Sequence, residues 1–240
     1  MKQRYVNASM QMLFIAFIIA ILMLSLLLLS GYVSRMREIP TEVWSEEPIT
    51  VIIDAGHGGE DGGTSGQNGI LEKDLNLDVA KKLDSLLRSA GINTVMTRND
   101  DRLLYDPLSD YKGRKKILDM HERLRIANSC ENAVFLSVHM NSFPQEKYCG
   151  LQVYYSRNSI DSMRFAESVQ GTVSKYLQPQ NERKIKQGKD IFLLDRLKMP
   201  AILVECGFLS NKDECSLLST EEYRDKLAFW IFYSIMCEIN

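Results

Sequence analysis

The sequence lacks the features by which several classes of protein are recognised. It has no CxxC pair among its five cysteines, so the spacing indicates neither a zinc ribbon nor a thioredoxin-type redox site. It also has no excess of basic charge, because 29 Lys and Arg stand against 31 Asp and Glu, for a net charge of -2. A broad basic face of the kind that binds nucleic acid is therefore not expected, and we predict no nucleic-acid partner.

Internal repeats and low-complexity tracts are absent too, and 45% hydrophobic with 25% charged residues is typical of a globular protein. One apolar run departs from this average, since residues 12–29 carry no charge and Ser25 is their only polar residue. As a helix this run covers roughly 27 Å, and residues 30–33 extend it past a hydrocarbon thickness of about 30 Å. We predict a membrane anchor over residues 12–33.

The residues around this run predict the orientation and the domain boundary. Lys2 and Arg4 favour a cytoplasmic segment over residues 1–11, which places the remainder outside the cytoplasm, anchored or exported. A cleaved signal peptide stays an alternative, although the run is long for one and no good small-x-small site ends it. Residues 34–48 contain two prolines and no apolar period, as expected of a juxtamembrane linker. A soluble domain over residues 49–240 follows.

Within that domain, apolar β-rich runs alternate with stretches of helical periodicity. Because buried strands separated by helices are typical of βαβ crossovers, we predict an α/β fold with a mixed, mostly parallel sheet and helices on both faces. Looser patterns predict an edge strand over 151–155 and another short strand over 191–194. The strands expected with most support are 49–54, 92–97, 133–138 and 201–205, and the expected helices are 71–90, 117–128, 160–177 and 221–239.

A glycine-rich loop, residues 54–63, follows the first strand. It is not a phosphate-binding loop, because Asp61 and Thr64 stand where GxGxxG and Walker motifs need glycine and lysine. We expect its glycines to let the backbone bend closely around His57. A lone histidine in a loop is usually structural, so a catalytic or metal-binding role requires partners.

Three further residues supply such partners. His139 follows the third buried strand as His57 follows the first, and parallel strands would direct both rings into one crevice. Glu72 opens a helix, where a carboxylate commonly complements the helix dipole, but it also shares a face with the core leucines and so needs a partner. Two imidazoles and a carboxylate form a known hydrolytic zinc site.

Glu205 ends the fourth buried strand, a poor position for a charge without a function. A carboxylate beside zinc can take a proton from water and deliver it to a leaving amine, and we assign Glu205 this role. Cys206 is more simply read as a buried residue on the opposite face of the strand, and His121 as a solvated helix residue.

These motifs resemble the zinc-dependent N-acetylmuramoyl-L-alanine amidases of the type 3 class. The resemblance runs from about Val51 to Ile239 and rests on IIDAGHGGEDGG, LEKDLNLDVA, MTRNDD, RLRIANS, FLSVHMNS and PAILVECGFLSN. The family implies hydrolysis of the amide between the muramic acid lactyl group and L-alanine of peptidoglycan. The short chain, with one apolar segment and no wall-binding repeats, is most similar to the members that act in sporulation and germination, which are implied to prepare cortex for muramic-δ-lactam formation.

The resemblance also implies roles for individual residues. His57, Glu72 and His139 would bind Zn²⁺ and Glu205 would be the catalytic acid and base, while Arg123 would brace the site or contact substrate. Asn141 and Asp54 are further candidates for substrate contact or support. The competing interpretations are an inactive, membrane-tethered wall-binding protein and a zinc peptidase that cuts within the stem peptide. The sequence identifies no regulatory protein partner.

Overall fold

A computed structural model describes residues 16–30, 48–67, 69–106, 108 and 112–239. It divides the chain into two compact units, Met1–Glu46 and Glu47–Asn240. In the first unit, residues 16–30 form a helix with exposed side chains, and no helix among the described residues is long and apolar enough to cross a membrane. The predicted segments 1–11, 12–33 and 34–48 lie wholly or partly outside the described residues and stay predictions.

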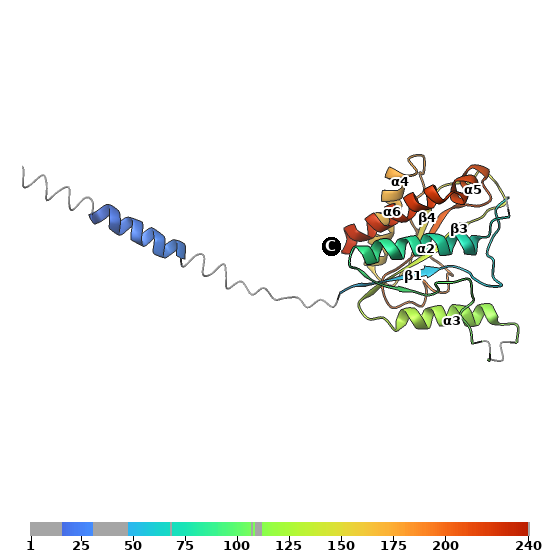
Figure 1. Ribbon diagram of the computed structural model, residues 1–240. Helices are drawn as coiled ribbons and strands as arrows, with labels where there is room; N and C mark the ends of the chain where they lie inside the picture. Colours follow the sequence, from blue (N-terminus) through green and yellow to red (C-terminus); the bar gives the residue numbers. More distant parts are fainter. Residues whose placement is uncertain (1–15, 31–47, 68, 107, 109–111, 240) are drawn as a thin grey trace, which may run out of the picture. The chain divides into compact units, whose positions relative to one another are not determined.

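The second unit is built on a mixed sheet of six strands in the order β2-β1-β3-β6-β4-β5 (Figure 1). The first four strands of this order are parallel, β4 is antiparallel to β6, and β5 is parallel to β4. The mostly parallel sheet expected from the sequence is therefore confirmed. The strands are β1 (Thr50–Ala55), β2 (Asn93–Met96), β3 (Ala133–Asn141), β4 (Gln152–Tyr155), β5 (Lys186–Gln187) and β6 (Ala201–Phe208).

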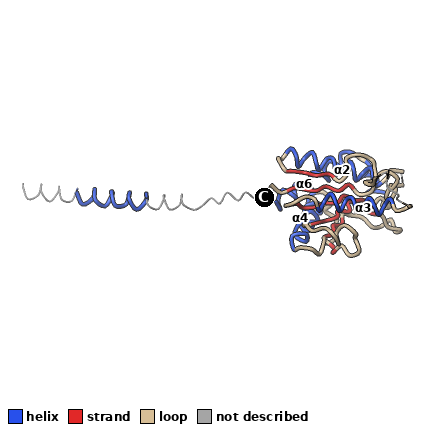
Figure 2. Tube along the Cα trace, turned by 90° about the horizontal axis from the view of Figure 1, so that it is seen from below, coloured by secondary structure: helices blue, strands red, loops and turns tan. Residues whose placement is uncertain are grey.

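Helices cover both faces of the sheet (Figure 1). One face carries α2 (Glu72–Ser89), α4 (Ile160–Tyr176), α5 (Lys212–Ser219) and α6 (Glu221–Ile239), and the other carries α3 (Lys115–Asn128). In the view from below, α3 lies in front of the strands (Figure 2). Successive side chains of a strand point to opposite faces, so Val51 and Ile53 enter the core under α2 while Ile52 enters the core under α3.

Three details differ from the sequence-based expectations. Residues 191–194 form turns rather than a strand, and Leu193 and Leu194 use their apolar surface to complete the core on the α3 face. The strand β4 is not at the edge, because the two-residue β5 pairs with its outer side. The helix α5 was not expected; it is short, and the Asn211 side chain caps it by accepting hydrogen bonds from two backbone N–H groups.

Candidate functional site

The carboxyl ends of three parallel strands bring two histidines and a glutamate to one edge of the sheet. His57 follows β1 by two residues, and His139 and Glu205 are register partners on β3 and β6. His139 lies within its strand, which runs on to Asn141 past a register shift, rather than just after its end as the sequence suggested. The rings of His57 and His139 have centroids 5.1 Å apart, so both imidazoles lie in one crevice.

Glu72, the first residue of α2, joins these two rings. Its Oε1 lies 3.2 Å from Nε2 of His57 and 3.0 Å from Nδ1 of His139, although the residue is only 4% exposed. Burial alone would raise the pKa of Glu72, but the hydrogen bonds and charges of His139 and His57 hold it well below its usual range. The carboxylate therefore remains ionised between two imidazoles.

These three side chains fit a divalent metal ion. One ligand atom from each of His57, Glu72 and His139 lies within 4.8 Å of the others. Among the described residues, no other group of three metal-ligating side chains lies this close together. Two imidazole nitrogens and one carboxylate oxygen are a donor set that zinc accepts, with a fourth position left for water or substrate.

Two glycines of the loop make room for the ligands. A Cβ atom at Gly56 would lie 2.2 Å from Cε1 of His139, and one at Gly63 would lie 2.5 Å from Oε2 of Glu72. Gly63 also has a φ of +67°, which side chains rarely adopt. The glycine-rich loop thus packs backbone directly against the ligands.

Glu205 lies beside this group without belonging to it. Its Oε2 is buried and, among the described residues, has no hydrogen-bond partner. Burial is the main cause that raises the pKa of Glu205 to about 7, with the nearby Glu72 charge adding to it and the two histidines opposing it. A carboxyl group with such a pKa can accept and return a proton near neutral pH.

Comparison with known proteins places this arrangement in a family. Residues 51–236 match the family described as N-acetylmuramoyl-L-alanine amidase (Amidase_3). The chain belongs to that amidase family. The germination-specific N-acetylmuramoyl-L-alanine amidase of Bacillus subtilis is 33% identical over 186 residues, which are 78% of each chain. The expected resemblance to the type 3 amidases, and to their germination members, is confirmed.

Solved structures agree with this assignment. The CwlD amidase from Clostridioides difficile, solved in complex with the GerS lipoprotein, is 37% identical with a TM-score of 0.76, over 79% of this chain and 97% of that one. An N-acetylmuramoyl-L-alanine amidase from Clostridium difficile 630 is 31% identical with a TM-score of 0.68, over 79% and 96%. The protein is thus an N-acetylmuramoyl-L-alanine amidase that acts on peptidoglycan.

A second charged cluster of the amidase lies next to the first, centred on Arg123 of α3. Its guanidinium donates to Oδ1 of Asp54 at 2.6 Å and to Oδ2 of Asp119 at 2.8 Å, and all three residues are at most 2% exposed. Burial alone would lower the pKa of Arg123, but these two carboxylates hold that pKa above its ordinary value. The guanidinium also donates to the carbonyls of Ala55 and His57. Arg123 and Asp54 therefore lie behind the crevice, where they hold its backbone.

Two contacts of the His57 loop had no counterpart in the sequence analysis. Oδ2 of Asp61 lies 2.8 Å from Nδ1 of His57 and 3.0 Å from Nζ of Lys116, so it orients the imidazole. Arg98, 1% exposed, donates to the carbonyls of Ala55 and Gly56. His57 itself has a φ of 62°, and these contacts hold it in that uncommon conformation. Asp61 and Arg98 lie within the motifs of the sequence, but the motifs do not indicate which atoms these side chains contact.

The remaining candidates of the sequence analysis lie outside this cluster. Asn141 is partly exposed at the end of β3, where its carbonyl accepts a hydrogen bond from Leu209. Cys206 is fully buried in the core on the α2 face, and burial raises the pKa of its thiol. His121 is exposed on α3 with its ring against Phe192, away from the other two histidines.

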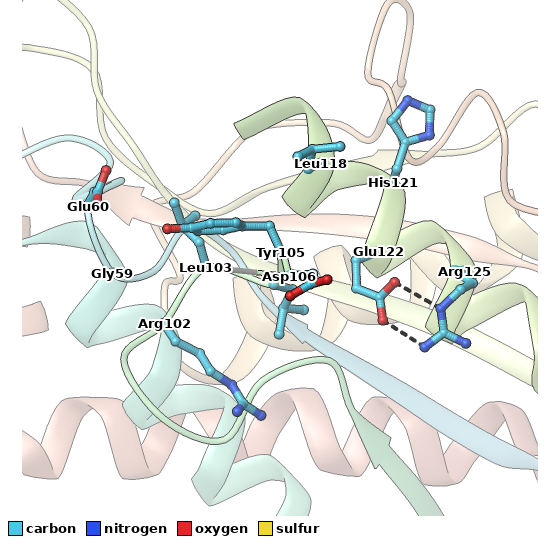
Figure 3. A pocket seen from close by; sticks show the side chains of 11 residues that line it. Gly59, Glu60, Arg102, Leu103, Tyr105, Asp106, Leu118, His121, Glu122 and Arg125 are labelled. Carbon is cyan, nitrogen blue, oxygen red and sulfur yellow. Dashed lines mark hydrogen bonds and ion pairs between the residues drawn. The ribbon is translucent and has the colours of Figure 1, made fainter. Parts of the chain in front are cut away.

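A cavity of about 870 Å³ opens between α3 and the loop that precedes it, and Figure 3 shows the side chains around it. Leu104 and Leu118 line it together with Tyr105, and the ion pair of Glu122 with Arg125 lies on its wall. None of its lining residues is a member of the His57, Glu72 and His139 group. Gly59 and Glu60, which follow His57 closely in the same loop, do line the cavity, so it adjoins that loop without including a candidate ligand.

Proposed function

We propose that the amidase binds zinc through His57, Glu72 and His139 and hydrolyses the amide between the lactyl group of muramic acid and L-alanine. The observation that carries this proposal is the convergence of two imidazoles and a buried carboxylate from three separate elements, with ligand atoms within 4.8 Å of one another. When bound there, zinc would supply a Lewis acid for the amide carbonyl and lower the pKa of a coordinated water.

The protein's own groups would then move the proton and hold the site. Glu205 accepts a proton from the attacking water and passes it to the departing amine, a transfer worth about a hundred- to ten-thousandfold in rate. Its unpartnered Oε2 and its pKa of about 7 suit both directions of this transfer. Arg123 and Asp54 brace the backbone of the crevice, and Asn141, partly exposed at the end of β3, stays a candidate for substrate contact.

The biological setting is part of the same proposal. We infer from the germination-specific relative that this amidase strips peptides from muramic acid so that muramic-δ-lactam forms in spore cortex. The complex of CwlD with a lipoprotein favours a protein partner for this chain as well. The apolar run 12–33 would anchor the enzyme to a membrane, with the catalytic domain 49–240 outside the cytoplasm.

The product amine tests this proposal. The full-length chain, loaded with zinc, is incubated with purified muropeptides, and the released peptides are sequenced by mass spectrometry. A free L-alanine amino terminus is expected, whereas a new terminus at an internal residue would show a peptidase.

Glu205→Ala should keep its zinc and lose turnover, and an active Glu205→Ala variant would contradict the assigned role. An inactive wall-binding protein would release no peptide at all.

A further inference from the structure

One partly buried arginine, which contacts the antiparallel strand partner of Glu205, makes no ion pair with a carboxylate among the described residues. Arg183, in the loop between α4 and β5, makes no ion pair with any described residue. Burial raises the pKa of Glu214 and the charge of Arg183 opposes this, but both oxygens of Glu214 already accept backbone N–H groups, from Gly150 and Phe208. A partly desolvated guanidinium without an anion is unfavourable unless a ligand supplies one.

The guanidinium of Arg183 is held in a fixed orientation. Its Nε donates to the carbonyl of Cys149 at 2.6 Å and its Nη1 donates to Oε1 of Gln152 at 3.3 Å. Its Cζ lies 4.6 Å from the ring centroid of Phe208. Phe208 is only 3% exposed. Nη2 makes no hydrogen bond to a described residue, so this end of the fork stays available for a ligand.

The strand pairing places this arginine close to the reacting bond. Gln152, which holds Nη1, is the direct antiparallel partner of Glu205, so both side chains lie on the same face of the sheet. Paired residues have Cβ atoms about 5 Å apart, and the side chain of Gln152 adds a few ångström more. These spacings put the free end of Arg183 on the order of 5–10 Å from the Glu205 carboxylate. Arg183 also lines an open depression of about 320 Å³.

The substrate offers a group at that distance. With consecutive Cα atoms 3.8 Å apart, a carboxylate on the second residue of the stem peptide lies about 7–8 Å from the scissile carbonyl carbon. A glutamate joined through its γ-carboxyl carries such a free α-carboxylate. We propose that Arg183 forms a subsite for the carboxylate of the second stem residue, which rests on the proposed amidase function.

The test compares two soluble muropeptides that differ in one group. One muropeptide has D-isoglutamate, with a free carboxylate, as the second stem residue. The other has D-isoglutamine, with a neutral amide, at the same place. The values of kcat/KM are measured for the full-length wild type and for Arg183→Gln and Arg183→Lys. The matched control is Arg196→Gln, because Arg196 also stacks over a phenylalanine, Phe192 at 4.2 Å, but lies near the amino end of β6.

The wild type should prefer the free carboxylate by ten- to hundredfold in kcat/KM, mainly through KM, because a hydrogen bond between two ionised groups is stronger than one to a neutral amide. Arg183→Gln should lose that preference while it cleaves the amide substrate within threefold of wild type, and Arg183→Lys should lie between them. Arg196→Gln should keep the full preference. A wild type without preference, or an equal loss on both substrates in Arg183→Gln, would overturn the subsite.

Failure of the amidase proposal would look different. If the wild type releases no peptide from either muropeptide, the proposed function is overturned, and binding of free L-Ala-D-isoGlu by calorimetry still decides the subsite. The wild type should then bind this dipeptide at least tenfold more tightly than Arg183→Gln does. Equal binding by both proteins would reject the carboxylate subsite by itself.

Discussion

Two charged clusters meet at His57, one at its backbone carbonyl and the other at its imidazole ring, and they differ in how completely their polar atoms are partnered. Around Arg123, which is 1% exposed, two carboxylates and two backbone carbonyls accept the hydrogen bonds that the guanidinium donates. Around Glu72, the imidazoles are partly exposed and Oε2 of the neighbouring Glu205 has no partner among the described residues. The first cluster fixes geometry because it is complete, and the second can bind and react because it is not.

The largest expected effect is on the incomplete cluster. His139→Ala should no longer retain zinc through gel filtration, because removal of a direct ligand should exceed the ten- to hundredfold loss typical of residues that only orient ligands. Zinc affinity is measured by competition with a chelator. His121→Ala is the control, since His121 is exposed on α3 and lies outside the group. Equal zinc content in the two variants would contradict the ligand set.

Substitution in the Arg123 cluster should instead lower the stability of the fold. Arg123→Leu leaves Asp54 and Asp119 buried without their cation, which should lower the free energy of unfolding by about 3–5 kcal/mol. Urea denaturation of the metal-free protein measures this change. Arg125→Leu, on the same helix but with an exposed ion pair to Glu122, should cost far less. If the two variants were equally stable, the Arg123 cluster would not brace the fold.

The unpartnered carboxyl group predicts a pH dependence of the metal-free protein. The pKa of Glu205 is raised to about 7, so its stabilising contribution is present below about pH 4.5 and is lost as pH rises through 7. Between pH 4.5 and 8, wild type should therefore lose about 3 kcal/mol of stability relative to Glu205→Gln. Parallel stability curves for the two proteins would show that Glu205 is not buried as a neutral acid.

The smallest effect concerns the contact that links the loop to α3. Asp61→Asn removes the carboxylate that orients Nδ1 of His57, and zinc affinity should fall ten- to hundredfold while stability changes little. Chelator competition measures the affinity, with Glu60→Gln as the control because Glu60 contacts Lys115 rather than a ligand. An affinity loss of the same size in both variants would indicate a general disturbance of the loop.

The sequence predicted most of the sheet because its central strands are unbroken apolar runs, and it suggested which four side chains to examine because strand ends of a parallel sheet meet at one edge. It failed where apolar residues serve another purpose, as in residues 191–194, which cover a sheet face from a loop. It also could not show that Arg98 reaches the carbonyls of Ala55 and Gly56, or that Arg183 reaches Gln152, because those contacts join residues 43, 42 and 31 positions apart.

The separation of the candidate ligands along the chain has a consequence for the coupling of metal binding to folding. The candidate ligands are far apart along the polymer, with 67 positions between Glu72 and His139 alone, so an unfolded chain offers an ion no ready chelate. Zinc would then bind the native state almost exclusively and raise its melting temperature in proportion to the logarithm of free metal. The free zinc around the enzyme would thereby set how long the folded protein survives, as well as how fast it works.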